Sequence, residues 1–153
     1  MTNDIKFEPI KPSDFDYFYD LRHRTMAEHY IRAGEVWDQE QEIQNHRKYL
    51  RQEGLKLIYN NGQRIGCVSV APYKEGLRLG LFCIEPQHQR KGLGEQVVQK
   101  VIEEAEEQRK DIFLDVLIKN PVCSLYERAG FEPIEGDCSI LVYYKKPCSS
   151  PIF

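Results

Sequence analysis

The sequence predicts one α/β domain of the α+β kind, built on a mixed, mostly antiparallel central sheet with helices on both faces. Three observations predict it. Segments with the strand period of two flank an Asn-Gly step at 61–62, a helical apolar stripe follows Gly94, and Ile112–Ile118 is a near-continuous apolar run. Because these patterns alternate along the chain, the strands must share one sheet that the helices cover.

The first fifty residues predict one strand and two helices. Residues 4–10 alternate apolar and polar side chains, which is typical of a short strand. Ser13 and Asp16 have the spacing of a capping pair, and an apolar helical face then runs to Gly34, so a helix is expected there. Residues 38–52 also have helical character, but they are so polar that this helix is expected on the surface.

The middle of the chain predicts three antiparallel strands. The runs 55–59 and 65–70 flank the Asn-Gly step, which is a strong hairpin signal. A second turn at 72–76 leads into a third strand at 77–85.

The last third alternates helices and strands. The helix after Gly94 has an apolar stripe opposite a run of glutamates, and Ile112–Ile118 reads as a central strand covered on both faces. Residues 122–129 predict a short helix ended by Gly130, and residues 140–144 predict a last strand.

Length and charge limit the possible classes of function. The chain has 153 residues with 21 basic and 24 acidic side chains, a net charge of −3. This is the size of one domain, expected over residues 1–146, with 147–153 as a flexible tail. No apolar run approaches the roughly 20 residues that cross a bilayer, so no membrane partner is expected. The mildly acidic total argues against nucleic-acid binding.

The cysteine pattern predicts reduced thiols. The number of cysteines is odd, and their spacing fits neither a C-x-x-C motif nor a zinc site. We therefore expect a cytoplasmic protein with no metal.

The turn at 86–94 carries the clearest functional signal. Gly92 and Gly94 allow the backbone to bend tightly and to expose N–H groups at the start of a helix, where the helix dipole favours an anion. Arg90 and Lys91 add two positive charges, which suits a pyrophosphate. The Walker pattern is absent, and the third glycine of the dinucleotide pattern is missing.

Two segments of the chain together resemble the GNAT N-acetyltransferase superfamily. The motif Q-x-x-G-x-G at 89–94 resembles the acetyl-CoA pyrophosphate loop of that superfamily. The segment 120–131, an Asn followed by Leu-Tyr-Glu-x-x-Gly-Phe, is similar to its other common motif. The resemblance covers residues 65–135 well and implies a GNAT-like sheet of six to seven strands, whereas the first 60 residues match only in layout.

The resemblance also implies a role for each matching position. Backbone groups of the last strand residues before the loop would pair with the pantetheine arm of acetyl-CoA, and the loop amides would hold its pyrophosphate. Asn120 would contact the same cofactor, and Tyr126 would donate a proton to the departing thiolate. The expected cofactor-binding residues are Phe82, Cys83, Ile84, Gln89, Arg90, Lys91, Gly92, Leu93, Gly94 and Asn120.

The general base is left open by the sequence. A primary amine must lose a proton before it attacks the thioester, and its pKa of about 10.4 makes the neutral form rare at neutral pH. Asp115 lies alone in an apolar run, where burial would raise its pKa, and it stands five residues before Asn120, where related N-acetyltransferases place a glutamate. Glu85 at the end of its strand and His88 in the loop are the other candidates.

The expected activity is direct acetyl transfer from acetyl-CoA to a small-molecule or peptide amine. Arg22 and Trp37, together with Arg24, could line the acceptor site, although a single Trp is more often a packing residue. The alternative is a non-catalytic sensor that binds acyl-CoA. A monomer or a homodimer is expected, the latter through an exposed edge strand at 140–144.

Overall fold

The computed structural model describes residues 3–51, 53–117, 123–136 and 140–145. Within these ranges seven strands form one sheet in the order β1-β2-β3-β4-β5-β7-β6, antiparallel throughout except between β4 and β5. The predicted α+β class, with a mixed and mostly antiparallel sheet, is therefore confirmed. The elements are β1 (Ile5–Pro9), α1 (Phe15–Arg32), α2 (Gln39–Leu50), β2 (Leu55–Asn60), β3 (Gln63–Tyr73), β4 (Gly76–Ile84), α3 (Leu93–Glu107), β5 (Ile112–Leu117), α4 (Cys123–Arg128), β6 (Glu132–Gly136) and β7 (Ile140–Lys145).

The β2–β3 hairpin follows the predicted turn chemistry. Asn61 and Gly62 both have left-handed backbone conformations, with φ of 52° and 81°. This is the combination that a tight two-residue hairpin turn requires, and Asn and Gly adopt it at least cost. The turn fixes the register in which Asn60 pairs with Gln63, so the hairpin prediction is confirmed.

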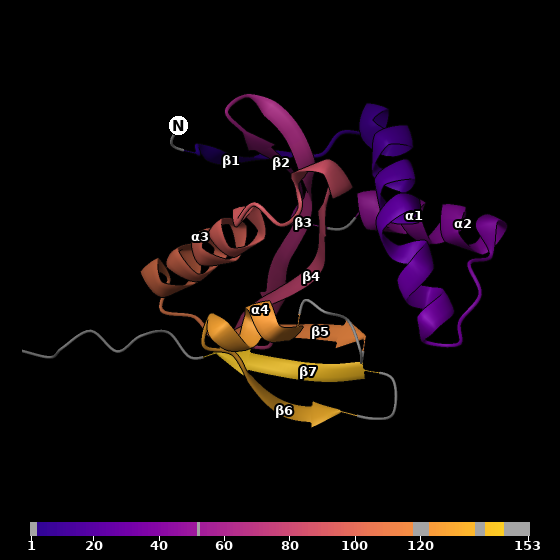
Figure 1. Cartoon of the computed structure of the whole chain (residues 1–153). Helices are drawn as coiled ribbons and strands as arrows, with labels where there is room; N and C mark the ends of the chain where they lie inside the picture. Colours follow the sequence, from indigo (N-terminus) through magenta and orange to yellow (C-terminus); the bar gives the residue numbers. More distant parts are fainter. Residues whose placement is uncertain (1–2, 52, 118–122, 137–139, 146–153) are drawn as a thin grey trace, which may run out of the picture.

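Helices cover both faces of the sheet (Figure 1), as the sequence predicts. On one face, Ile58 and Leu114 of the sheet pack against the apolar stripe of α3 and against α4. On the other face, Leu55 and Leu57 pack against Phe18 of α1. Leu57 and Ile58 are adjacent on β2 and enter different cores, because successive strand residues point to opposite faces.

The start of α1 differs from the prediction. A short 3-10 turn at Pro12–Asp14 precedes the helix, and the backbone N–H of Lys11 donates to the carboxylate of Asp14 at 2.9 Å. The predicted pair of Ser13 with Asp16 is therefore wrong. Asp14 accepts the hydrogen bond from the free N–H of Lys11, which precedes the short turn, and α1 itself begins at Phe15.

The position of the last strand also differs from the prediction. Residues 140–144 belong to β7, which lies between β5 and β6 and is not an edge. The outer strand is β6, whose Pro133 and two glutamates do not resemble a strand in the sequence. The expected edge for dimerisation at 140–144 is therefore wrong. Residues 147–153, the expected tail, and Asn120 lie outside the described residues.

Within the described ranges, no helix has the length and apolarity needed to cross a membrane. The same part of the chain contains no cluster of three potential metal ligands.

Candidate functional site

The site begins where β4 and β5 stop pairing. Their parallel pairing covers only three residue pairs and ends at Leu79 opposite Leu114. On the other side of β4, Val68 pairs with Phe82 while Val70 pairs with Leu79, so β4 has one extra residue at this point. Such a bulge bends the strand. The final residues of β4 therefore diverge from β5 and leave backbone groups on that side without a β5 partner.

The loop after β4 is shaped by its own side chains. The Gln89 amide donates to the carbonyl of Ile84 at 2.9 Å and holds the loop against the end of the strand. Gly92, with φ of 75°, is the residue before α3, and a side chain added there would enter open space. A methyl group on Gly94 would lie only 3.4 Å from the Leu125 side chain, so α3 begins close to α4.

The backbone of this loop can bind an anion. Among the described residues, the N–H groups of residues 90–94 have no backbone acceptor, and Gln96 is the first whose N–H bonds within the turn, to Gly92 at 3.2 Å. These amides lie at the N-terminal, positive end of the α3 dipole, a position that suits phosphate oxygens. The exposed side chains of Arg90 and Lys91 add formal charge beside them. The loop therefore has the features that the sequence predicts for a pyrophosphate site.

Tyr126 lies on α4, next to the start of α3. It is 4% exposed, and its ring packs edge-on against Phe131 with centroids 5.7 Å apart. Burial raises the pKa of its hydroxyl above the ordinary tyrosine value, and the neighbouring Cys83 and Cys123 thiols raise it further. Its hydroxyl is therefore protonated at neutral pH, as a proton donor must be.

Glu85, a candidate base, is not solvated at the end of β4. Its side chain is 11% exposed, and one carboxylate oxygen accepts from Arg24 Nη2 at 2.6 Å. The other accepts from the Gln87 amide at 3.3 Å. Arg24 lies on α1, where it also pairs with Asp20 at 2.7 Å. Its bond to Glu85 therefore joins α1 to the end of β4. The structure brings Arg24 and Glu85 together, a pairing that sequence spacing cannot reveal.

The other candidates for the base are placed only in part. The backbone of Asp115 lies in β5 opposite Val142, and its side chain lies outside the described part of the structure. His88 is half-buried in the loop, and its Nε2 atom has no hydrogen-bond partner among the described residues.

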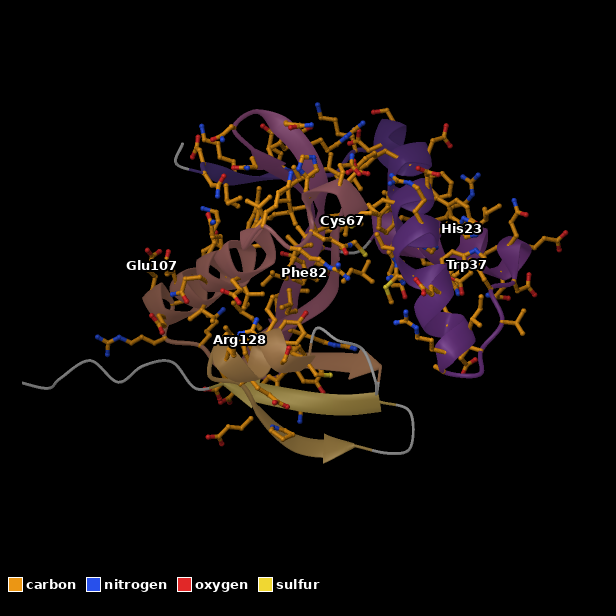
Figure 2. All side chains as sticks on the ribbon, in the orientation of Figure 1. His23, Trp37, Cys67, Phe82, Glu107 and Arg128 are labelled. Atoms are coloured by element: carbon orange, nitrogen blue, oxygen red, sulfur yellow. The ribbon has the colours of Figure 1, made fainter. Side chains whose placement is uncertain are left out.

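Arg22 and Trp37 are both packed against other side chains. Arg22 lies between α1 and the sheet, and Trp37 lies among side chains of α1 and α2. Arg22 is 5% exposed and directs Nη1 at the Cys83 sulfur, 3.9 Å away. Trp37 packs at an angle against aromatic rings of α1 and α2, with its centroid 5.2 Å from that of His23 (Figure 2). Its indole N–H donates to the Tyr19 hydroxyl. Their role in acceptor binding stays a prediction.

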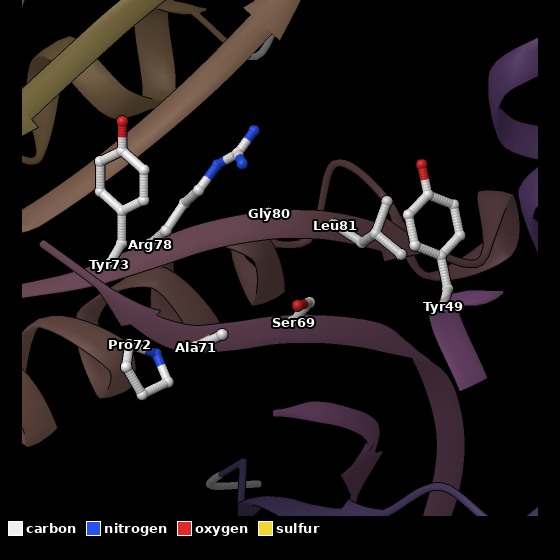
Figure 3. Close-up of a pocket in the computed structure, with 8 residues that line it drawn as sticks. All are labelled: Tyr49, Ser69, Ala71, Pro72, Tyr73, Arg78, Gly80 and Leu81. Carbon is white, nitrogen blue, oxygen red and sulfur yellow. The ribbon is translucent and has the colours of Figure 1, made fainter. Parts of the chain in front are cut away.

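An open pocket lies beside the bulge of β4. Its volume is about 320 Å³, and Tyr49 reaches it from α2 while Tyr73 and Arg78 stand at the opposite end (Figure 3). The sequence does not predict this pocket, because its walls come from three elements that only the fold brings together. The residues that line it are Tyr49, Ser69, Ala71, Pro72, Tyr73, Arg78, Gly80 and Leu81.

Comparison with protein families gives a match over the centre of the chain. The family of acetyltransferase (GNAT) domains matches residues 51–133, which include the loop, Tyr126 and the strands from β2 to β5. No curated protein sequence matches the chain.

Solved structures share the fold over nearly the whole chain. The PaiA N-acetyltransferase from Thermoplasma acidophilum in complex with coenzyme A is 16% identical, with a TM-score of 0.72, over 94% of this chain and 99% of that one. The ribosomal-protein-S18-alanine N-acetyltransferase from Escherichia coli is 17% identical, with a TM-score of 0.73, over 98% and 97%. An aminoglycoside 6'-acetyltransferase type Ii is 16% identical, with a TM-score of 0.67, over 99% and 100%. These identities are low, so the similarity establishes the fold alone.

Proposed function

This chain belongs to the GNAT acetyltransferase family, and we propose that it transfers an acetyl group from acetyl-CoA directly to a primary amine. The observation that carries the proposal is the row of loop amides at 90–94, which lack a backbone acceptor at the start of α3. They stand beside a strand that has separated from its neighbour. A diphosphate with a long, thin arm fits this combination, because the amides can bind its charge and the strand can bind its arm.

The residues that would hold acetyl-CoA follow from this fit. The amides of residues 90–94 would bind the pyrophosphate, supported by Arg90 and Lys91, and Gln89, whose own N–H donates to the Pro86 carbonyl oxygen, would hold the loop in place. The backbone of Phe82, Cys83 and Ile84 would pair with the pantetheine arm in the manner of an added strand. Asn120 is proposed as a further contact. When bound, acetyl-CoA supplies the activated thioester.

The proton donor in this proposal is Tyr126. Its hydroxyl stays protonated at neutral pH because burial raises its pKa. A free phenol has a pKa of about 10 and a thiol a pKa of about 8.5, so the Tyr126 hydroxyl would stabilise the departing thiolate as a hydrogen-bond donor and share its proton with the sulfur while the C–S bond breaks. Tyr126 also lies near Cys83 in the last residues of β4, the strand along which the pantetheine arm would carry the cofactor sulfur.

The base in this proposal is Asp115 or Glu85, acting directly or through water. Glu85 is held by Arg24 and Gln87, so it would act only if the acceptor amine displaces one of these partners or a water carries the proton. Asp115 stays the other candidate, because burial in the apolar run around it would raise its pKa.

The acceptor amine in this proposal enters through the open pocket beside the bulge. Gly80 lies in the wall of this pocket, and a methyl group added there would meet only Ser69 Oγ, at 3.5 Å. This is an ordinary contact, so Gly80→Ala should fold normally while narrowing the pocket. A raised KM for the amine, with an unchanged KM for acetyl-CoA, is the expected result.

The test of the activity is thiol release from acetyl-CoA with a panel of amino acids, peptides, polyamines and amino sugars. We expect turnover with at least one amine, and Tyr126→Phe should lower kcat by about 10²-fold while acetyl-CoA still raises the melting temperature. Tyr59→Phe is the matched control, because Tyr59 is a half-buried tyrosine of β2 that packs against the other hydrophobic core than Tyr126 does. It should keep its kcat. Binding of acetyl-CoA without turnover on any amine would support the sensor instead.

A further inference from the structure

Two cysteines face each other across neighbouring strands beneath α1. Cys67 of β3 pairs directly with Cys83 of β4, and their side chains are 0% and 3% exposed. Directly opposed residues of an antiparallel pair point to the same face. Both cysteines contribute to the core on the α1 side, where Cys67 is labelled in Figure 2. Both are free, and a hydrogen bond joins the two thiols.

A buried arginine lies against this pair. The Arg22 guanidinium is 5% exposed, its Nη1 lies 3.9 Å from Cys83 Sγ, and its Nε has no hydrogen-bond partner among the described residues. The same description gives Arg22 no carboxylate partner; its polar neighbours are the two thiols, the Tyr30 hydroxyl and the His46 ring, which is neutral at neutral pH. A buried cation is costly without a counter-charge. A thiolate on Cys83 supplies that charge.

The hydrogen bonds favour the charge on one sulfur. The hydrogen bond from Cys67 and the positive charge of Arg22 lower the pKa of Cys83, and that bond together with burial raises the pKa of Cys67. The pair therefore divides into a thiolate at Cys83 and a thiol at Cys67. This is the division of roles found in dithiols that undergo oxidation, where one sulfur attacks and the other resolves.

We propose that Cys83 and Cys67 form a redox-active dithiol that hydrogen peroxide converts into a disulfide between β4 and β3. The Cys83 thiolate attacks one peroxide oxygen, the O–O bond breaks, and the departing hydroxide takes a proton to give water and a sulfenic acid. The Cys67 sulfur then attacks the Cys83 sulfur, and the hydroxyl group leaves as a second water with the Cys67 proton. A small neutral oxidant is required because the pair is almost completely buried.

The disulfide would alter the strand that leads to the loop. Opposed residues have Cβ atoms about 4.5–5.5 Å apart, whereas a disulfide needs about 3.5–4.5 Å, so β3 and β4 must move closer. Gly66 already lies so close to β4 that a methyl group on it would overlap the Cys83 carbonyl oxygen. The bond would therefore be strained and easily reduced. It would also remove the counter-charge of Arg22 and weaken the packing of α1.

The test treats the reduced full-length chain with hydrogen peroxide and follows it by intact mass and peptide mapping. We expect a loss of two hydrogen masses, mapped to a Cys67–Cys83 linkage and reversed by dithiothreitol. Cys67→Ala should instead stop at a Cys83 sulfenic acid that dimedone captures. Cys123→Ala is the matched control, because Cys123 is a free cysteine outside the pair. It should form the disulfide at the wild-type rate.

The role of Arg22 is tested by the rate of oxidation. Arg22→Met should slow it by about tenfold or more, because a neutral thiol is a poor nucleophile. Should that variant fail to fold, the wild-type protein gives the answer through pH. A thiolate already present at pH 6 gives a rate that changes little up to pH 8, whereas an ordinary thiol gives a steep rise. No linkage between these two cysteines, or a steep rise with pH, would overturn the proposal.

Discussion

His46 of α2 should make the stability of this protein depend on pH. The side chain is 0% exposed, its Nδ1 lies 2.6 Å from the Glu42 carbonyl oxygen, and its Nε2 has no hydrogen-bond partner among the described residues. Burial and the positive charge of Arg22 together lower its pKa from the usual value to about 4, although the bond to the Glu42 carbonyl acts in the opposite direction. His46 is therefore neutral in the folded protein at neutral pH. The groups that face it are the Glu42 carboxylate, Arg22 and the rings of Phe18, Tyr19, Trp37 and Tyr49.

The sign and size of the effect follow from the two pKa values. In the unfolded chain the pKa of histidine is about 6.5, so between pH 6.5 and 4 the unfolded state binds a proton that the folded state does not. The stabilising contribution is fully present above pH 6.5 and is lost as the pH falls toward 4. Between pH 8 and pH 5 the free energy of unfolding should fall by about 2 kcal/mol from His46 alone.

The assay is urea unfolding at several pH values, followed by the fluorescence of Trp37. This residue is the only tryptophan of the chain, and its ring lies 5.9 Å from that of His46. His46→Leu keeps a similar volume and cannot titrate, so the difference between the two proteins isolates His46 from other groups that titrate in the same range. His23→Gln, at an exposed histidine, is the control. Equal pH slopes in the wild type and in His46→Leu would refute the reasoning.

Further substitutions test the core, the loop and the ion pair. Ile58→Ala should lower the free energy of unfolding by about 2–5 kcal/mol, measured in urea, because Ile58 is fully buried against α3. Gly92→Ala and Gly62→Ala both place a side chain at positive φ with open space around it and should each cost about 1–2 kcal/mol. Only the first should weaken acetyl-CoA binding in calorimetry. Arg24→Met should cost about 1–3 kcal/mol in the same urea assay, because Glu85 loses its guanidinium partner, and adding Glu85→Gln should restore part of it.

The parts of the fold that the sequence predicts well are those encoded locally. The Asn61–Gly62 turn fixes a hairpin through two adjacent residues, and the glycines of the loop fix the start of α3 within one turn. Motif spacing likewise locates the loop before α3 and the helix α4 that carries Tyr126, since each motif is a contiguous stretch of sequence, while their functional roles stay predictions. Two local predictions are wrong. The capping residue is misplaced because Asp14, next to Ser13, accepts the hydrogen bond from the free N–H before the helix. The outer strand β6 is missed because Pro133 is untypical of a strand.

The contacts that define the site's charges could not be predicted, because they join residues about sixty positions apart. Glu85 looks solvated in the sequence, yet Arg24 of α1 binds it. Arg22 looks like a residue of the acceptor site, yet it packs against Cys83. The polarity of 38–52 predicts a surface helix, and its single fully buried histidine gives no periodic signal. The pattern of polar and apolar residues predicts the average exposure of a segment, whereas these individual contacts depend on how α1 and α2 pack against the sheet.

The contacts that α1 and α2 make with the sheet also indicate which part of the chain should determine the choice of acceptor amine. The family match begins at residue 51, so α1 and α2 precede it, while the loop and Tyr126 lie within it. These two helices nevertheless supply Arg24, bound to Glu85 at the end of β4, and Tyr49 in the wall of the pocket. We therefore expect substitutions at Tyr49 to change which amines are acetylated while leaving the affinity for acetyl-CoA unchanged. Loop substitutions should do the reverse, because in the proposed complex the amides at 90–94 would bind the cofactor whatever the acceptor is.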